Sequence, residues 1–457
     1  MHEALAALVR ACDQALGGQS LDRSVEIVGR GSLASRFPVT ALAVASIASA
    51  GAALRDLCEE VPAPRPAVTV DRRLASFWFR SSVRPLGWTI PGPWDPIAGD
   101  YRCRDGWIRL HTNAPLHRAA AERVLGAHAD KEAMARAVAP WGRSELEQAV
   151  VDAGGCAAEM RSITEWASHP QGQAVAAEPL VRRQTLPATT SGWHGRFDPA
   201  RPLAGVRVLD LTRVLAGPVA SRFLAGYGAE VLRIDPPLWE EPAVVAEVAV
   251  GKRLARLDLR SSAGQARLRE LLRQADVLLL GYRADALDRL GFGPAERAAM
   301  APDLVEVAID AYGWSGPWAA RRGFDSLVQM SSGIADAGMR WRHADKPHPL
   351  PVQALDHATG YLMAAAALRG VRQRRHGAIE RSRLSLARTA KLLVDCEHLA
   401  SDDEPLAAET DEDRAPDIER TGWGDARRLR PPLVIEGVPM RWDLPARPLG
   451  SDPAAFL

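Results

Sequence analysis

Cysteine is scarce in this chain, which has five cysteines among 457 residues. The count is odd, no two cysteines lie close together and no CxxC pair occurs, so the sequence predicts neither a disulfide framework nor a zinc site. The spacing of His111 and His117 suits no metal-binding pair, and we expect no bound metal. The first residues lack the basic-then-apolar order of a signal peptide, so we expect a protein of the reducing cytoplasm.

Net charge is almost absent as well, because 57 basic residues stand against 56 acidic ones. This balance gives no reason to expect a nucleic acid or an anionic membrane as partner. Long runs of bulky apolar residues are also missing. Residues 37–54 carry no charge, but they are mostly Ala, Ser, Gly and Val, whereas membrane spans are rich in Leu, Ile, Phe and Val. We therefore expect a buried helix there and no membrane partner.

Strand and helix patterns alternate after Trp193. Apolar strand patterns occur at 206–211, 229–235, 276–282 and 304–313, an edge-strand pattern occurs at 251–260, and a helix pattern with a Ser cap occurs at 261–275. Such alternation implies βαβ units and a parallel sheet. Residues 200–395 are therefore predicted to form an α/β domain with an open, Rossmann-like parallel sheet and helices on both faces.

The remaining segments have other patterns. Residues 76–190 alternate aromatic and polar residues around an Asp-Gly turn at 105–106 and then become helical, which predicts a smaller α+β domain. Residues 396–457 begin with an acidic run at 401–413, expected to be a solvated, mobile linker, and continue as a Pro-rich extended tail.

Residues 1–75 are predicted to be helical and contain an internal echo. The run VTALAVASIASAGAALRDL resembles DHATGYLMAAAALRGV, and a strand-like piece follows each run. Aligning the two ALR triplets places Leu42 opposite Asp356, so the first segment reads as a degenerate copy without the carboxylate. The alternative is that two Ala-rich helices resemble each other by chance.

A nicotinamide dehydrogenase is the first rival interpretation. The order of strand, helix and strand ending at Asp235 imitates a dinucleotide-binding unit, but the turn TRVLAGP has no GxGxxG, and Gly226 and Gly228 fall at the end of the helix. Without glycines in the turn, backbone amides cannot closely approach a pyrophosphate, so this activity is disfavoured. No GxSxG elbow supports a serine hydrolase either.

Four consecutive segments carry a family resemblance. They are PLAGVRVLDLTRVLAGPVASRFLAGYGAEVLRIDPP, GKRLARLDLRSSAGQARLRELLRQADVLLLGYRADALDRLGFG, AYGWSGPWAARRGFDSLVQMSSG and QALDHATGYLMAAAALRG, within a continuous match of about 190 residues. This region resembles the class III CoA-transferases, also called the CaiB/BaiF family, of the formyl-CoA and carnitine CoA-transferase type. In that family the small domain follows the Rossmann half, whereas here it precedes it, and the Gly-rich loop that closes over the intermediate has no clear counterpart.

The resemblance implies a CoA-transferase with Asp356 as nucleophile. The enzyme would take an acyl-CoA and a small carboxylic acid as substrates, hold no permanent cofactor and form a homodimer. Asp356 precedes a long Ala-rich helix, whose dipole and unpaired amides favour the charged carboxylate that attacks a thioester. From the residues alone, a helix cap is the favoured interpretation of Asp356, and it is the resemblance that favours the nucleophile.

The resemblance also implies contacts to CoA. They would come from Arg213, Val214, Leu215, Ala216, Lys252, Arg253, Tyr282, Arg289 and Tyr312. Lys252 and Arg253 could instead be a solvated pair, and Tyr312 could pack in the core. Gly281 stands where the family usually has Asn, so we expect one polar contact to be lost.

Three further positions separate the possible activities. Asp325 is expected to be a helix N-cap, and His357 is expected to have a packing or surface role. Racemases of the family carry a His before that Asp, whereas this chain has Phe324, which cannot take a proton, so racemisation is disfavoured. The rearranged order and Gly281 leave open a non-catalytic CoA-binding protein on the same fold.

Overall fold

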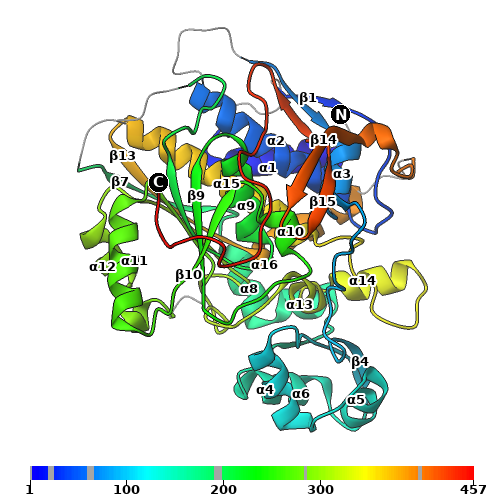
Figure 1. Cartoon of the computed structure of the whole chain (residues 1–457). Coiled ribbons are helices and arrows are strands. Elements are labelled where there is room, and N and C mark those ends of the chain that lie inside the picture. Colours follow the sequence, from blue (N-terminus) through cyan, green and yellow to red (C-terminus); the bar gives the residue numbers. More distant parts are fainter. Residues whose placement is uncertain (1–2, 19–24, 59–65, 190–197, 283–285, 400–403) are drawn as a thin grey trace.

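A seven-stranded sheet lies at the centre of the molecule (Figure 1). The computed structural model describes residues 3–18, 25–58, 66–189, 198–282, 286–399 and 404–457. The strand order is β10-β9-β8-β11-β12-β13-β7, in which only the edge strand β7 is antiparallel. The strands are β8 (Arg207–Leu211), β9 (Glu230–Asp235), β10 (Lys252–Arg256), β11 (Val277–Leu280), β12 (Val305–Asp310), β13 (Ala378–Ser385) and β7 (Arg182–Pro187). The predicted Rossmann-like sheet is confirmed.

Helices cover both faces of this sheet. Val208 and Val277 point into a core shared with α9, α15 and α2, whereas the next residues, Leu209 and Leu278, point into a second core beneath α11. This alternation arises because successive side chains of a strand face opposite sides. The covering helices are α2 (Val39–Cys58), α9 (Ala216–Gly226) and α15 (Ala354–Arg375) on one face and α11 (Ser262–Gln274) and α12 (Pro294–Met300) on the other.

Shorter helices connect the sheet to its surroundings. Most of these helices follow a strand of the sheet, at its carboxyl end. Two others, α7 (Ile163–Ser168) and α8 (Pro170–Ala177), precede the edge strand β7. The remaining elements are α10 (Val245–Val248), η2 (Asp288–Leu290), α13 (Asp325–Ser331), α14 (Ile334–Trp341), α16 (Leu386–Asp395) and η3 (Glu397–Leu399).

A small domain lies below the sheet in Figure 1. It consists of the antiparallel strands β4 (Gly99–Cys103), β5 (Gly106–Leu110) and β6 (Ala157–Glu159) with helices α4 (Pro115–Leu125), α5 (Lys131–Val138) and α6 (Arg143–Asp152). The hairpin expected around Asp105 is present. The unit is shorter than the predicted 76–190, because β7 joins the large sheet and β3 (Val83–Pro85) joins a C-terminal strand. β7 is a polar, largely exposed edge strand, so it carries no apolar periodicity.

The two ends of the chain fold together. One three-stranded sheet combines β1 (Val25–Val28), β2 (Val68–Asp71) and β16 (Leu433–Ile435). Another combines β3, β14 (Arg414–Thr421) and β15 (Gly424–Leu429), and Figure 1 shows these C-terminal strands beside α3 (Arg72–Trp78). Helix α1 (Glu3–Leu16) packs on α2.

The acidic segment differs from the expected mobile linker in the part that the structure describes. Asp413, in η4 (Asp411–Asp413), pairs with Arg73 at 2.8 Å, and Glu409 pairs with Arg84 at 2.5 Å. The backbone of Glu404 also accepts a hydrogen bond from the amide of Ser32. The prediction was wrong because the neutralising arginines lie more than 300 residues earlier in the chain. Residues 400–403 lie outside the described residues.

Helix α2 is the predicted buried, apolar helix. In the described part of the chain it alone is long and apolar enough to cross a membrane, and 83% of its most apolar window is buried. It lies alongside α15 and runs in the same direction: Phe37 and Leu350, just before the two helices, line one pocket, and Asp56 and Arg369 approach to 3.9 Å near their ends. Small side chains permit this close packing.

The echoed segments also continue alike. After α2 the strand β2 ends at Asp71, which caps α3, and after α15 the strand β13 ends at Ser385, which caps α16. Asp71 lies as far beyond Arg55 as Ser385 lies beyond Arg369. The two segments therefore share the order helix, strand, cap and helix.

Candidate functional site

Asp356 lies in the first turn of α15, at the carboxyl edge of the sheet. The helix crosses over between the parallel strands β12 and β13, so its start lies where those strands end. Ligands of open α/β sheets bind at this edge. The side chain is nevertheless well covered, because Asp356 is only 8% exposed.

Asp325 holds the start of α15 from a neighbouring helix. Its Oδ2 accepts hydrogen bonds from the amides of Leu355 and Asp356 at 2.9 and 3.0 Å, and the side-chain amide of Gln329 donates to Oδ1. Asp325 therefore caps α15, and the prediction that it is the N-cap of its own helix was wrong. Its own helix, α13, has Phe324 at the N-cap position.

Burial and a neighbouring acid control the charge of Asp356. Burial raises the pKa of Asp356 well above its usual value, and the nearby Asp325 carboxylate raises it further. Burial also raises the pKa of Asp325, to about 6, although the hydrogen bonds of Gln329 and of the two amides oppose this. The helix start was expected to favour the charged form of Asp356, but Asp325 occupies the amides that would have stabilised it, and burial disfavours that form.

The loop after β8 has a strained backbone. Val214 has φ 65°, a left-handed conformation that is rare for a β-branched residue. Its amide donates to Glu241 Oε1 at 2.6 Å, which helps to hold it there. Leu215 then forms the N-cap of α9, and Ala216 begins the helix. Strained residues of this kind cluster at binding and catalytic sites, which supports the predicted role of this loop.

Two glycines allow this loop to approach its neighbours. A Cβ on Gly217 would lie 2.2 Å from the Cβ of Thr212, which no packing tolerates. A Cβ on Gly281, after β11, would lie 3.2 Å from the same atom. Gly281 thus lets the loops after β8 and β11 lie close together. This is a packing role, separate from the polar contact expected to be lost because the family usually has Asn at this position.

Arg213 lies between two aromatic rings at the point where the strand order reverses. Its guanidinium is 4.4 Å from the ring centroid of Tyr282, which follows β11, and 4.6 Å from that of Trp239, which follows β9. Such cation–π contacts fix the planar guanidinium. β8 and β11 are neighbours from the two halves of the fold, so this cluster occupies the topological switch point, where ligands bind in open α/β sheets.

Trp239 was missed by sequence reasoning. The available signal was its place in the run PPLWEEP, directly after the strand that ends at Asp235. An aromatic side chain in a loop at the carboxyl end of a strand is a candidate ligand contact.

Lys252 and Arg253 do not belong to this edge. They begin β10 and therefore lie at the amino end of the parallel sheet. Lys252 is completely buried, donates to the carbonyl of Pro218 at 2.8 Å and lies 3.5 Å from Asp210. Burial lowers the pKa of Lys252 to about 7. The predicted phosphate contact is therefore wrong for Lys252, because its buried ammonium binds the first turn of α9 from below, and the backbone of Arg253 lies at the amino end of the strands.

Tyr312 is a core residue. It is 1% exposed, its hydroxyl lies 3.2 Å from Ser331 Oγ, and its ring packs edge-on against Trp318. The structure thus favours the packing alternative over a thioester contact. Arg289 lies exposed on η2, just after residues 283–285, which fall outside the described residues.

The small domain meets the site through two histidines. The ring of His111 stacks on Phe324 with centroids 3.8 Å apart, and His117 packs against the edge of the same ring. Burial lowers the pKa of His111 to about 3 and that of His117 to about 4, so both rings are neutral near pH 7. His357 is buried and stacks on Phe79, which confirms its predicted packing role.

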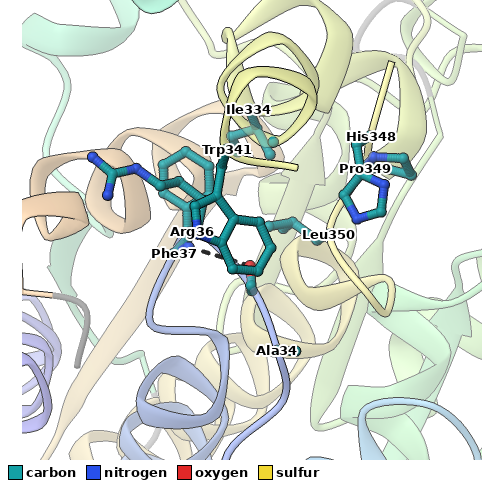
Figure 2. Close-up of a pocket in the computed structure, with 10 residues that line it drawn as sticks. Ala34, Arg36, Phe37, Ile334, Trp341, His348, Pro349 and Leu350 are labelled. Atoms are coloured by element: carbon teal, nitrogen blue, oxygen red, sulfur yellow. Dashed lines mark hydrogen bonds between the residues drawn. The ribbon is translucent and has the colours of Figure 1, made fainter. Parts of the chain in front are cut away.

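A pocket opens beside the start of α15 (Figure 2). It lies between residues 34–37, helix α14 and residues 348–350, and its enclosed space of about 10 Å³ has room for about one water molecule. Figure 2 shows Trp341, Ile334 and Leu350 around the opening, with the guanidinium of Arg36 turned away from them. Among the residues that the structure describes, no group of three or more His, Cys, Asp or Glu side chains could hold a metal ion.

Comparisons with known proteins show what this chain is similar to. The family description CoA-transferase family III matches residues 203–422. An acyl-CoA transferase of Gibberella moniliformis is 30% identical over 288 residues, covering 59% of this chain and 51% of that protein. A succinyl-CoA:glutarate CoA-transferase of Mus musculus is 31% identical over 229 residues, covering 46% and 49%.

A solved structure of a CaiB/BaiF family protein from Brucella suis superimposes with a TM-score of 0.37 at 24% identity, covering 50% of this chain and 65% of that one. The chain spans about half the length of the curated relatives named above. The family match includes the β8 loop, Asp325 and Asp356, and it extends beyond the predicted boundary at 395. Residues 203–422 of this chain match the description of CoA-transferase family III, the family that the sequence resembles.

Proposed function

We propose that this protein is a CoA-transferase that moves CoA between an acyl-CoA and a carboxylic acid through a covalent intermediate on Asp356. One observation carries the proposal: a carboxylate lies at the carboxyl edge of a Rossmann-like sheet whose switch point holds Arg213 between Trp239 and Tyr282. The family match and the named activities of the relatives support the same reaction type.

The proposed chemistry needs no cofactor. Asp356 Oδ attacks the thioester carbonyl, the C–S bond breaks, and CoA leaves as the thiolate while a mixed anhydride forms. The thiolate then attacks the side-chain carbonyl of Asp356, which releases the donor acid and leaves an aspartyl-CoA thioester. The acceptor carboxylate repeats both steps in reverse, regenerating Asp356 and forming the new acyl-CoA. Each bond broken is replaced by a bond of similar energy.

The surroundings of Asp356 suit this chemistry. A covered side chain excludes water, which would otherwise hydrolyse an anhydride. Asp325 fixes the first turn of α15 through two backbone hydrogen bonds, so the nucleophile has a defined position. The raised pKa makes the carboxylate, once ionised, a stronger nucleophile.

The direct test of the proposed function is a transfer assay. Purified protein is incubated with a panel of acyl-CoAs and pooled carboxylic acids, and new acyl-CoAs are detected by mass spectrometry. We expect at least one donor and acceptor pair to exchange CoA. The proposal fails if CoA binds but no pair in the panel exchanges.

Replacing Asp325 with Asn should shift the pH dependence of transfer. The asparagine side chain keeps a carbonyl oxygen for the amides of Leu355 and Asp356 but removes the negative charge that raises the pKa of Asp356. Asp356 then ionises at lower pH, so the rising acid limb of the pH–rate profile should move to lower pH. Transfer rates measured from pH 5 to 9 check this, and an unmoved acid limb would show that the Asp325 charge has no influence.

Replacing Arg213 with Met should weaken CoA binding by roughly 10–100-fold, the loss expected for one hydrogen-bonded charge. The matched control is Arg253→Met, because Arg253 lies at the opposite end of the sheet and should leave the dissociation constant unchanged. Calorimetric titration with CoA at fixed ionic strength gives both values. Equal losses in the two variants would contradict the assignment of Arg213.

A non-catalytic CoA-binding protein is the second candidate. The observation that favours it is the coverage of Asp356, which does not line the pocket described above. Such a protein would bind CoA with the same dependence on Arg213 but would exchange CoA with no acid. We further propose a cytoplasmic, homodimeric protein that binds neither nucleic acid nor membrane, as the sequence leads us to expect.

A further inference from the structure

One carboxylate oxygen joins the loops after β8 and β9. Glu241 Oε1 accepts the amide of Val214 at 2.6 Å and the indole N–H of Trp239, also at 2.6 Å. The two donors follow neighbouring parallel strands, whose carboxyl ends lie together. Glu241, only 7% exposed, thus binds both the strained residue next to Arg213 and one of the two rings that contact its guanidinium.

The carboxylate of Glu241 is itself held from below. Its Oε2 accepts a hydrogen bond from Arg233 at 2.7 Å, and Arg233 is completely buried and also pairs with Asp235 at 2.9 Å. The backbone carbonyl of Glu241 accepts the amides of Val244 and Val245 at 3.1 and 3.0 Å. Charge-assisted hydrogen bonds to a carboxylate that is fixed in this way are short and directional, so it can hold both loops in one arrangement.

The loop after β9 has a second support that does not involve Glu241. Arg256 donates to the backbone carbonyls of Pro237 at 2.6 Å and Trp239 at 2.9 Å. The backbone of this loop is therefore held from another side. In the described part of the chain, Glu241 is the one acceptor of the Trp239 indole N–H and of the Val214 amide. Loss of its carboxylate would thus free the ring and the strained turn while the backbone path after β9 remains.

We propose that Glu241 is a positioning residue of the CoA site, which presets the Arg213 side chain by fixing the turn beside it and the Trp239 ring against it. The proposal rests on the proposed function, because it takes the Arg213 cluster as the place where CoA binds. It goes beyond that function, because Glu241 acts through Arg213 and touches no substrate. A guanidinium that is already ordered loses less conformational freedom when it binds a ligand, which increases affinity.

Replacing Glu241 with Met tests this role. Methionine has a similar length but cannot replace the carboxylate as acceptor, and Arg233 keeps Asp235 as its counter-ion. Because CoA must then order the freed side chains of Arg213 and Trp239, its affinity should fall by roughly tenfold. Glu241→Gln keeps an oxygen for both N–H groups and should keep most of the wild-type affinity. Calorimetric titration with CoA at fixed ionic strength gives the dissociation constants.

Asp235→Asn is the matched control. It changes the other carboxylate that pairs with the same buried Arg233, but in the described structure this carboxylate bonds to neither loop. The dissociation constant of CoA should therefore stay at the wild-type value. Equal losses of affinity in Glu241→Met and Asp235→Asn would overturn the proposal, because the effect would then come from the buried ion pair.

A double substitution distinguishes positioning from a general structural role. If Glu241 acts through Arg213, the combined Glu241→Met and Arg213→Met protein should bind CoA no more weakly than Arg213→Met alone. Additive losses would overturn the proposal. Should Glu241→Met not fold, Trp239→Phe takes its place in this cycle with the same expectation, since phenylalanine keeps a ring beside Arg213 but gives Glu241 no N–H.

The transfer assay separates this proposal from the proposed function. In Glu241→Met the loss should appear in KM, with kcat near that of the wild type, because Asp356 lies on a different element. Non-additive CoA binding in a protein that transfers CoA to no acid supports the positioning role and overturns the transferase. Additive CoA binding in a protein that does transfer CoA overturns the positioning role and leaves the transferase in place.

Discussion

Replacing Asp356 with Asn should reduce CoA transfer by at least about 1,000-fold, because removal of a nucleophile eliminates the covalent route. Asparagine has nearly the same shape and leaves the amide hydrogen bonds to Asp325 in place. Binding of CoA should therefore change little, and the loss should appear in kcat. Transfer assays with saturating acyl-CoA, together with calorimetric titration of CoA, measure the two effects separately.

The same substitution should stabilise the protein at neutral pH. A carboxyl group whose pKa is raised in the folded state contributes stability that is present at low pH and is lost as pH rises through the folded pKa. The neutral asparagine side chain carries no such penalty, so at pH 8 the Asp356→Asn variant should unfold at a higher temperature than the wild type. In domains of about 150–250 residues, each 1 kcal/mol of stability shifts the unfolding temperature by roughly 2–4 °C. The difference should disappear near pH 4.

Asp336 provides a matched control for Asp356. It is also 8% exposed, but it lies on α14 and pairs with Arg340 at 3.0 Å. Asp336→Asn should keep most of the transfer activity and should not raise the unfolding temperature. If the two substitutions affect transfer equally, Asp356 is not the nucleophile.

Replacing Glu247 with Gln should destabilise the protein by about 3–5 kcal/mol, the usual cost of breaking a buried ion pair from one side. Glu247 pairs with the fully buried Arg222, lies 3.7 Å from Arg428 and accepts the amides of Ser82 and Val83 at 2.8 and 3.0 Å. Glu247, on α10, thus connects α9 to the segment before β4 and to the C-terminal strand β15. The substitution leaves Arg222 charged, buried and without its counter-ion.

The unfolding temperature should fall by roughly 6–20 °C in Glu247→Gln, given 2–4 °C per kcal/mol. Burial opposes ionisation of Glu247, but Arg222, Arg428 and the hydrogen bonds from Ser82 outweigh it and lower its pKa to about 2. A depressed pKa contributes stability that is present above the unfolded value of about 4.3 and is lost as pH falls towards 2. The gap between wild type and variant should therefore narrow below pH 4.

An exposed ion pair supplies the control for this prediction. Glu132 pairs with Arg136 on α5 at 3.2 Å, with both side chains largely in solvent. Glu132→Gln should leave the unfolding temperature almost unchanged, because exposed pairs contribute little. Scanning calorimetry at pH 7 and pH 3 measures the unfolding temperatures of the wild type and the two variants. A Glu247→Gln protein that unfolds at the same temperature as the wild type at pH 7 would contradict the account.

The central sheet was predictable because its strands carry local signals. The runs around Val208, Val231 and Val277 are short, apolar and followed by loops and helices, and these features are sufficient for a parallel order. The position of Asp356 at the carboxyl edge follows from the same order, since a crossover helix starts where the preceding strand ends. The predicted role of the β8 loop in CoA binding, which stays a prediction, came from this argument together with the family resemblance.

Other features depend on contacts between residues far apart in the chain. Sequence reasoning assigned Asp356 to a charged state because it did not include Asp325, which takes the helix amides and adds a like charge. Sequence reasoning assigned Lys252 to phosphate binding because it did not consider that Lys252 lies at the amino end of β10. It also did not consider which face of the sheet the side chain occupies. The acidic segment looked mobile because Arg73 and Arg84, which pair with it, belong to the other end of the chain.

Trapping the intermediate on Asp356 is the most direct test of the proposed reaction. The wild-type protein is incubated with the acyl-CoA that gives the fastest transfer, treated with hydroxylamine or borohydride, digested and examined by mass spectrometry. We expect a mass change confined to the peptide that contains Asp356 and absent from Asp356→Asn. An unmodified Asp356 peptide in protein that is actively transferring CoA, or a modification on another residue, would contradict the account.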